Sequence, residues 1–336
     1  MNASYHAGDI TYKWLFGYTY QIKYTSYTNN VSPDDYCTID SVCFGDGTNG
    51  SLTRINGPMA FCAAPARDGV AISPSIKMNE YITTHTYPGP GNYKMCFLQP
   101  NRNPGIINMA NSVNQTISFE SLLVISTFIG PNTSPKFINH PIAYGCLNNG
   151  CFTYNPLATD IDGDSLAYKL LPCTGYGQIP SYAFPTAGVG GTFSIDSVTA
   201  LLSWCNPQLS GDYNVAIKIE EWRKNTDGDY ILIGYVIRDT QFTIDNCTGI
   251  DDRNTKNTEV LVYPNPAKET ITISLSKDKY TIELYDVTGR KLKTVLNNES
   301  LKEESLQIQL DNINPGIYFI KIINSDKTIT KKFIKQ

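Results

Sequence analysis

Regular alternation of side chains near the start of the chain constrains the fold most. In residues 5–30, tyrosine, threonine and isoleucine recur with a period of two, as in Ile10-Thr11-Tyr12-Lys13-Trp14. This period is typical of β-strands with one buried face. Leu15-Phe16-Gly17 interrupts the pattern, so we expect two strands joined there. No long segment has the apolar spacing of an amphipathic helix, and tyrosine, threonine, asparagine, glycine and proline are abundant. The sequence therefore predicts an all-β protein.

A change of composition near residue 258 indicates a domain boundary. Residues 259–336 contain 12 of the 27 lysine and arginine residues and 10 of the 31 aspartate and glutamate residues, a net charge of +2. The first 258 residues contain 15 basic and 21 acidic residues, a net charge of −6. Residues 249–258 are polar and are expected to form a flexible linker.

Charge and hydropathy exclude two classes of function. The overall net charge of −4 argues against nucleic acid as the main partner. The longest apolar run, Leu122–Ile129, is far shorter than the roughly 20 residues of a membrane-spanning helix, so no transmembrane segment is expected.

Nine cysteines in an all-β chain indicate an oxidising compartment. They fall into two regions, and we expect pairing within each: Cys37, Cys43, Cys62 and Cys96, then Cys146, Cys151, Cys173, Cys205 and Cys247. The sequence leaves their connectivity open, and the odd number leaves at least one thiol free or paired between chains. Alternatively, several are simply small buried apolar residues. The chain lacks Cys-x-x-Cys and has only three histidines, which argues against a zinc cluster.

Four short motifs follow one another in residues 259–336. They are Tyr263-Pro264-Asn265-Pro266, Asp286-Val287-Thr288-Gly289-Arg290, Asn314-Pro315-Gly316-Ile317-Tyr318-Phe319 and the basic end Lys331-Lys332-Phe333-Ile334-Lys335-Gln336. In this order the segment resembles the type A C-terminal sorting domain of type IX secretion cargo. The resemblance assigns a sorting role to nine residues: Tyr263, Pro264, Asn265, Pro266, Gly289, Gly316, Tyr318, Lys331 and Lys332.

This resemblance implies a destination and a set of partners. The type IX translocon and its outer-membrane shuttle barrel are expected to recognise the tail, and a sortase-like peptidase to cleave it in or near residues 248–258. The protein is then expected to be extracellular or on the outer-membrane surface of a Gram-negative bacterium. Such cargo also needs an N-terminal export signal. Because Met1-Asn2-Ala3-Ser4-Tyr5 leads directly into a strand-like segment, we expect that signal to lie upstream or to have been removed.

The first 248 residues resemble modules of bacterial surface proteins. Phe44-Gly45-Asp46-Gly47 and His85-Thr86-Tyr87 with Pro88-Gly89-Pro90-Gly91-Asn92-Tyr93 are similar to a PKD-type domain, and Asp160-Ile161-Asp162-Gly163-Asp164 to a cadherin-like module. Pieces such as Pro100-Asn101-Arg102-Asn103 and Glu220-Glu221-Trp222-Arg223 resemble gliding-motility-associated surface proteins. We therefore expect three consecutive immunoglobulin-like β-sandwiches: a PKD-like sandwich at 1–130, a cadherin-like one at 131–248 and, after the linker at 249–258, the sorting sandwich at 259–336.

Asp160, Asp162 and Asp164 form the best candidate metal site. Alternate carboxylates around Gly163 can converge on one hard cation, and the cadherin-like resemblance implies calcium, with Glu220 or Asp196 as distant ligands. The alternative is a solvated turn whose carboxylates accept bonds from backbone amides. Asn225-Thr226-Asp227-Gly228-Asp229 repeats the spacing, but there a hairpin between 217–223 and 230–238 is sufficient explanation.

Catalysis finds little support in the sequence. Nucleophile-elbow, zincin and phosphate-loop motifs are absent, and His6, His85 and His140 are dispersed. We therefore expect a non-enzymatic structural or adhesion protein, with a glycan-binding module as the alternative and a polysaccharide hydrolase behind both. Aromatic residues crowd the start of the chain: Tyr5, Tyr12, Trp14, Tyr18, Tyr20, Tyr24, Tyr27 and Tyr36. Alternation predicts that half of these tyrosines point outward, where they can stack on sugars or on a second copy.

Overall fold

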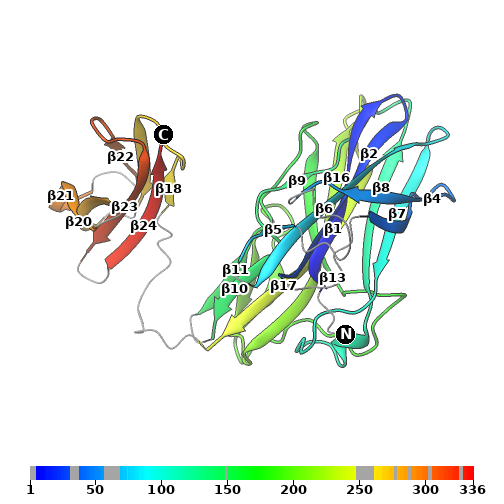
Figure 1. Cartoon of the computed structure of the whole chain (residues 1–336), viewed down its shortest axis with the longest axis horizontal. Coiled ribbons are helices and arrows are strands. Elements are labelled where there is room, and N and C mark those ends of the chain that lie inside the picture. The colour runs from blue at the N-terminus through cyan, green and yellow to red at the C-terminus, as the bar shows by residue number, and fades with distance from the viewer. Residues whose placement is uncertain are drawn as a thin grey trace. The chain divides into compact units, whose positions relative to one another are not determined.

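The chain folds into two compact units, residues 1–247 and 248–336 (Figure 1). The computed structural model describes residues 5–30, 38–56, 69–73, 75–147, 150–246, 261–275, 278–286, 289–301, 305–324 and 328–336. Strands dominate these residues, with a short 3-10 helix, η2 (Ser112–Asn114), between two of them. The predicted all-β class is confirmed.

The strands of the first unit run in chain order as follows: β1 (Tyr5–Phe16), β2 (Thr19–Asn29), β3 (Thr38–Cys43), β4 (Asn49–Arg54), β5 (Val70–Ala71), β6 (Ile76–Thr86), β7 (Gly91–Gln99), β8 (Ile117–Ile125), β9 (Lys136–Phe137), β10 (Ile142–Cys146), β11 (Cys151–Tyr154), β12 (Ala158–Thr159), β13 (Ser165–Leu171), β14 (Phe193–Ile195), β15 (Leu202–Cys205), β16 (Gly211–Lys224) and β17 (Tyr230–Asp245). The predicted strand pairs around Gly17 and across residues 225–229 are both present, as β1–β2 and β16–β17.

Most of these strands belong to one sheet that closes on itself. Its order is β1-β2-β6-β4-β3-β7-β8-β17, and β17 returns to β1 where Gly8 lies opposite Asp239. The closed part surrounds a core of apolar and aromatic residues drawn from 5–125. Tyr24 lies at its centre, fully buried, with its ring 5.1 Å from those of Phe97 and Phe119.

Strand β17 is shared by two cores. Its residues Gly234–Ile237 pair with β8 of the first core, and most of its length pairs with β16, which contributes to a second core from residues 152–244. Trp204 is fully buried there, 4.7 Å from the Tyr213 ring. The predicted boundary at residue 130 therefore separates two cores but not two independent units, because β17 supplies backbone hydrogen bonds to both.

Disulfides fix each core of the first unit separately. Cys43 on β3 is bonded to Cys96 on β7, and Cys151 on β11 to Cys205 on β15. Both bonds join cysteines of the same region, as the sequence predicted. Cys173 is a buried free thiol. Cys37, Cys62 and Cys247 lie outside the described residues.

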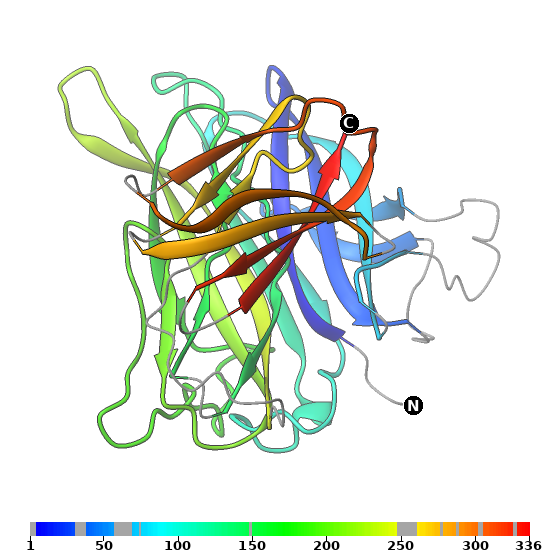
Figure 2. The same cartoon turned by 90° about the vertical axis from the view of Figure 1, so that its left-hand side faces the viewer.

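The second unit is a two-layer sandwich of short strands (Figure 2). Its strands are β18 (Leu261–Tyr263), β19 (Thr270–Ser274), β20 (Lys279–Asp286), β21 (Lys291–Ser300), β22 (Ser305–Gln309), β23 (Gly316–Ile323) and β24 (Thr328–Lys335). One sheet has the order β18-β19-β22 and the other β21-β20-β23-β24. A separate apolar core from residues 267–333 lies between them. The expected linker at 249–258 lies outside the described residues.

The membrane prediction concerns helices. Within the part of the chain that the structure describes, no helix is long and apolar enough to span a bilayer.

Candidate functional site

Asn265, a predicted sorting residue at the start of the tail, is hydrogen-bonded to the last strand. The Ile334 amide donates to Asn265 Oδ1 at 2.9 Å, and Asn265 Nδ2 donates to the Lys332 carbonyl at 3.4 Å. Ala267 continues the contact, because its amide donates to the Ile334 carbonyl at 2.8 Å. The opening motif and the basic end, 65 or more residues apart in sequence, thus form one structural feature.

The other predicted sorting residues lie at turns and strand starts. Gly289 has a φ of 80° in the β20–β21 turn, a conformation that favours glycine, and Arg290 Nε closes the turn by donating to Asp286 Oδ2 at 3.0 Å. Gly316 begins β23 opposite Lys335. The Tyr318 hydroxyl donates to the Asn314 carbonyl at 2.7 Å.

The remaining predicted sorting residues lie at the end of β18, just after it, and on β24. Tyr263 ends β18 with 48% of its surface exposed, next to Pro264 and Pro266. Lys331 and Lys332 lie on β24 opposite Ile320 and Phe319.

The predicted metal-binding aspartates form a turn above strand β13. Asp160 Oδ1 accepts hydrogen bonds from the amides of Asp162, at 2.9 Å, and Asp164, at 3.0 Å. Asp162 Oδ2 accepts the Thr133 amide at 2.7 Å. These are the backbone bonds that the solvated-turn alternative predicts, and they leave Asp160 Oδ2 buried without a hydrogen-bond partner.

Arg223 holds the third aspartate. Its Nε donates to Asp164 Oδ1 at 2.7 Å, and Nη2 donates to Oδ2 at 2.5 Å in a bidentate pair. Nη1 donates to the carbonyls of Ile129 and Pro131, both at 2.8 Å. One arginine therefore ties the aspartate turn to the segment that follows β8.

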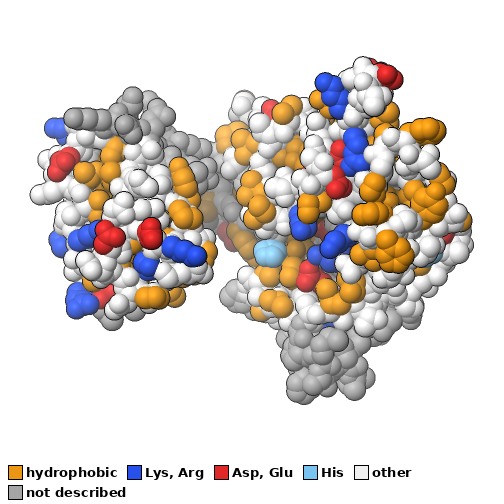
Figure 3. Space-filling model, turned by 90° about the horizontal axis from the view of Figure 1, so that it is seen from above, with side chains coloured by type: hydrophobic (Ala, Val, Ile, Leu, Met, Phe, Trp, Pro, Cys, Tyr) orange, Lys and Arg blue, Asp and Glu red, His pale blue; other side chains and the backbone are white. Residues whose placement is uncertain are grey.

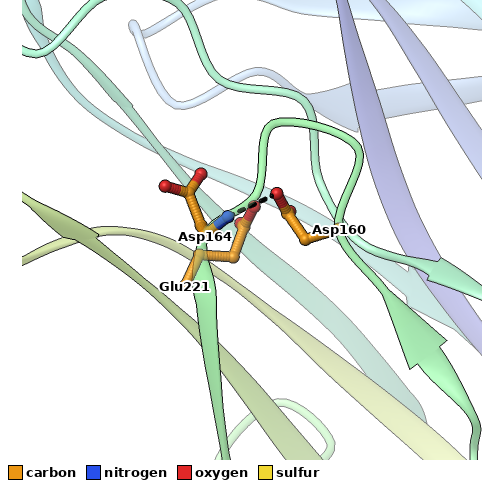
Figure 4. Close-up of side chains that lie close together, drawn as sticks. All are labelled: Asp160, Asp164 and Glu221. Atoms are coloured by element: carbon orange, nitrogen blue, oxygen red, sulfur yellow. Dashed lines mark hydrogen bonds between the residues drawn. The ribbon is translucent and has the colours of Figure 1, made fainter.

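Glu221 on β16 joins this cluster and was missed by the sequence reasoning, which named Glu220 instead. Ligand atoms of Asp160, Asp164 and Glu221 all lie within 4.8 Å of one another (Figure 4). Glu221 is fully buried. Glu220 points to lysines, with Lys169 and Lys218 Nζ atoms each 2.9 Å from its carboxylate. The other proposed distant ligand, Asp196, accepts the amides of Val198 and Thr199 in its own turn.

Burial dominates the protonation of Glu221. It raises the pKa of this carboxyl to about 8, and the charges of Asp160 and Asp164 act in the same direction. Hydrogen bonds from the Tyr12 hydroxyl, at 2.9 Å, and from Asn132 Nδ2, at 3.1 Å, oppose the rise. The cluster can therefore hold either a proton or a hard cation between its carboxyl groups.

The predicted outward row of tyrosines is absent from the described part of residues 5–30. Five of the tyrosines are buried: Tyr5, Tyr12, Tyr20, Tyr24 and Tyr27. Tyr18 is 37% exposed, and Tyr36 lies outside the described residues. The prediction was wrong because Tyr12, Tyr20 and Tyr24 all lie on the face that packs in the first core. Tyr27 lies on the opposite face, where it packs with Ala7 and Ile76.

A groove of about 450 Å³ lies between the β1–β2–β6 sheet and residues 133–140. The segment is fixed to β1, because the Ser134 amide donates to the Tyr12 carbonyl at 3.0 Å and the Trp14 amide donates to Thr133 Oγ1 at 3.2 Å. Figure 3 shows basic, acidic and histidine side chains together among hydrophobic ones on one face of this unit.

Paired charges form the base of this groove. Arg238 Nε lies 3.0 Å from Asp9 Oδ2, and each residue is only 3% exposed. The Phe137 ring lies 4.3 Å from the Arg238 guanidinium carbon, a cation–π contact. Lys23 and Glu80 form a second pair at 2.9 Å nearer the surface.

The histidines are engaged in packing and hydrogen bonds. His85 Nε2 lies 2.7 Å from Asp46 Oδ2, and its ring stacks on Phe44 with centroids 4.1 Å apart. Although burial acts to raise it, the hydrogen bonds from Thr48 and His85 hold the pKa of Asp46 at about 2. His6 bonds to Gln241 and Asn29, and His140 to the Tyr27 hydroxyl. Among the described residues, no histidine is bonded to a serine, threonine or cysteine side chain.

A family model matches the tail. Residues 261–336 match the family described as the secretion system C-terminal sorting domain, which supports the interpretation of the chain as type IX secretion cargo. The tail indicates export to the cell surface or the extracellular space. The match covers only the second unit, and it says nothing of what the first unit binds.

Other comparisons are distant. No curated protein matches the chain at a significant level. Three similar solved structures are the Ig1-2 module of the Drosophila receptor protein tyrosine phosphatase DLAR (16% identity, 60% of this chain, 97% of that chain, TM-score 0.18), the BSP domain of a biofilm associated protein (10%, 100% and 67%, 0.23) and the FN1-FN3 domains of chicken CNTN1 (14%, 98% and 98%, 0.17). At such TM-scores no role is transferred from them.

Proposed function

We propose that this chain is a non-enzymatic structural or adhesion protein of the cell surface, exported by the type IX system. The match of residues 261–336 to a secretion sorting domain carries this proposal. By the same proposal the translocon, its outer-membrane shuttle barrel and a sortase-like peptidase act on the tail. The first unit is then the part that works outside the cell.

The architecture of the first unit supports a binding or structural role. Its two cores share β17, each core has a disulfide, and charged side chains at the junction are paired in the interior. Three acidic side chains of this unit are buried or paired. Glu221 is fully buried, Asp9 is paired with Arg238, and Glu80 is paired with Lys23. We infer that this unit has a binding or structural role.

Cells of the producing bacterium can test this role. A strain without the chain is compared with strains that produce the wild-type chain or an unrelated cargo carrying the same residues 261–336. We expect only the wild-type chain to restore attachment to a surface, or an ordered layer visible by electron microscopy. Equal attachment and equal surface structure in all three strains would exclude the role.

Calcium at the aspartate turn stays a prediction. Its support is the unpartnered Asp160 Oδ2 beside Asp164 and Glu221. Arg223 weakens it, because the guanidinium already balances Asp164. Calorimetric titration with calcium at about pH 8.5, where Glu221 is largely ionised, should release heat with the wild type and not with Asp160→Asn. Absence of heat from the wild type would exclude calcium there.

Glycan binding is the second candidate function. The groove beside residues 133–140 favours it over assembly of copies through tyrosine faces, because the described tyrosines of β1 and β2 are mostly buried.

A further inference from the structure

The groove carries a positive charge on a part of the chain that is otherwise acidic. Four basic residues line it, Lys13, Lys23, Lys136 and Arg238, against two carboxylates, Asp9 and Glu80. Residues 1–258 as a whole have a net charge of −6. A basic groove on an acidic surface concentrates anions locally, since its field opposes that of the surroundings.

Two of these cations have no ion-pair partner within the part of the chain that the structure describes. Asp9 is paired with Arg238 and Glu80 with Lys23, so both carboxylates of the groove are already neutralised. Lys13 on β1 and Lys136 on β9 are exposed and form no ion pair with any described residue. They come from the two different walls of the groove.

The walls also offer apolar and hydroxyl groups in fixed places. Phe137 is held over Arg238, and the Arg238 Nη1 atom donates to the Asn139 carbonyl at 2.7 Å. Gln21, Thr11 and Thr133 supply uncharged polar groups along the groove. A flat apolar ring with nearby hydroxyl and amide groups suits the face and edge of a sugar.

An extended peptide fits this groove less well. Peptides commonly bind β-proteins by adding a strand to a free sheet edge. Here β2 lies between β1 and β6. The other edge of β1 meets β17 at Gly8 and residues 133–134 at Tyr12 and Trp14, so the sheet wall presents mainly a face to the groove.

We propose that the groove between β1–β2–β6 and residues 133–140 binds an acidic oligosaccharide, with Lys13 and Lys136 contacting sugar carboxylates and Phe137 packing on a sugar ring. This deepens the adhesive role proposed above and rests on it. The inference concerns one groove, however, so it can fail while surface attachment through another face persists.

Binding of a short oligogalacturonate to the purified full chain tests the proposal. Calorimetry at low ionic strength should detect binding to the wild type. The double variant Lys13→Ala with Lys136→Ala should weaken it about tenfold, as expected for two exposed charge contacts. Phe137→Ala should also weaken it. Lys224→Ala, which removes an exposed lysine of the β16–β17 hairpin outside the groove, is the matched control and should bind as the wild type does.

Three ligands and one cellular assay complete the test. The methyl-esterified oligogalacturonate should not bind, because it lacks the charge. Tighter binding of an oligoglutamate than of oligogalacturonate would overturn the proposal in favour of an acidic peptide. No binding to the wild type, or equal binding to the lysine double variant, would also overturn it. If cells need the chain for attachment but attach equally with the wild type and the lysine double variant, the groove proposal is refuted and the adhesive role remains.

Discussion

The Tyr12 hydroxyl donates a hydrogen bond to Glu221 Oε2 at 2.9 Å, joining β1 of the first core to β16 of the second. Asn132, in the segment between them, donates to both groups: to the Tyr12 oxygen at 3.0 Å and to Glu221 Oε1 at 3.1 Å. All three side chains are buried. A polar network of this kind is costly unless every member is satisfied, so it helps to fix how the two cores pack.

Protonation of Glu221 should make stability depend on pH. The folded-state pKa of about 8 lies above the ordinary value of 4.5. The stabilisation that this proton contributes is therefore fully present below pH 4.5 and is lost as the pH rises through 8. We expect the free energy of unfolding to fall across this window by a few kcal/mol, because each unit of pKa shift corresponds to about 1.4 kcal/mol. Urea unfolding followed by tryptophan fluorescence measures it, since Trp14, Trp204 and Trp222 all lie in the first unit.

Substitution of Glu221 tests whether this residue causes the pH dependence of stability. Glu221→Gln should remove most of the slope between pH 4.5 and 8 while keeping an acceptor for Tyr12. Glu220→Gln is the adjacent control, because lysines lower the pKa of Glu220 against the effect of burial and it is ionised throughout the window. A slope unchanged in Glu221→Gln would contradict the assignment.

The Arg102–Asp239 pair should be the most sensitive charge contact of the first unit. Arg102 is fully buried and donates to both Asp239 oxygens, at 3.0 and 2.7 Å. Asp239→Asn leaves the guanidinium charge buried without compensation, so we expect a loss of about 3–5 kcal/mol in the free energy of unfolding.

A matched control tests whether burial is the reason. Lys169→Ala removes a cation that pairs with Glu220 at a largely exposed position, and it should cost less than about 1 kcal/mol. Similar losses of unfolding free energy in the two variants would show that burial does not make the Arg102–Asp239 pair more important for stability.

Asn265 should hold the start of the sorting domain to its end. Asn265→Ala removes the acceptor of the Ile334 amide, and hydrogen–deuterium exchange at Ile334 should become faster in the full chain. Asn265→Asp keeps an oxygen acceptor and should retain protection. If the amide is equally protected in all three proteins, the contact does not stabilise β24.

Local patterns predicted local structure well. The Asn225–Asp229 turn lies where glycine and asparagine signals place it, and the Asn225 side chain accepts the Asp229 amide at 2.8 Å. Gly45 and Gly47 both take φ values of 88°, a conformation that favours glycine, and Asp46 between them accepts the Thr48 amide. These features depend on residues a few positions apart, so the sequence contains the information they need.

Contacts between distant segments were not predictable in this way. The alternation predicts that Tyr20 and Tyr24 lie on one face of β2. It does not predict that Tyr27, on the opposite face of the same strand, is buried as well. Glu221 was missed because its partners, Asp160 and Tyr12, lie 61 and 209 residues away. The signal that could have found it is the period of two in β16: Glu221 follows Val215, Ile217 and Ile219 on the face that packs in the second core, where a buried carboxyl needs a partner.

Localisation of a tail-deleted chain tests the central claim most directly. The claim is that residues 261–336 bring the first unit to the cell surface or beyond it. Both chains carry the N-terminal export signal that such cargo needs. In a host with a working type IX system, the full chain should then be found at the cell surface or in the medium, and a chain ending at Val260 should stay inside the outer membrane. Surface exposure of the truncated chain equal to that of the full chain would contradict the account.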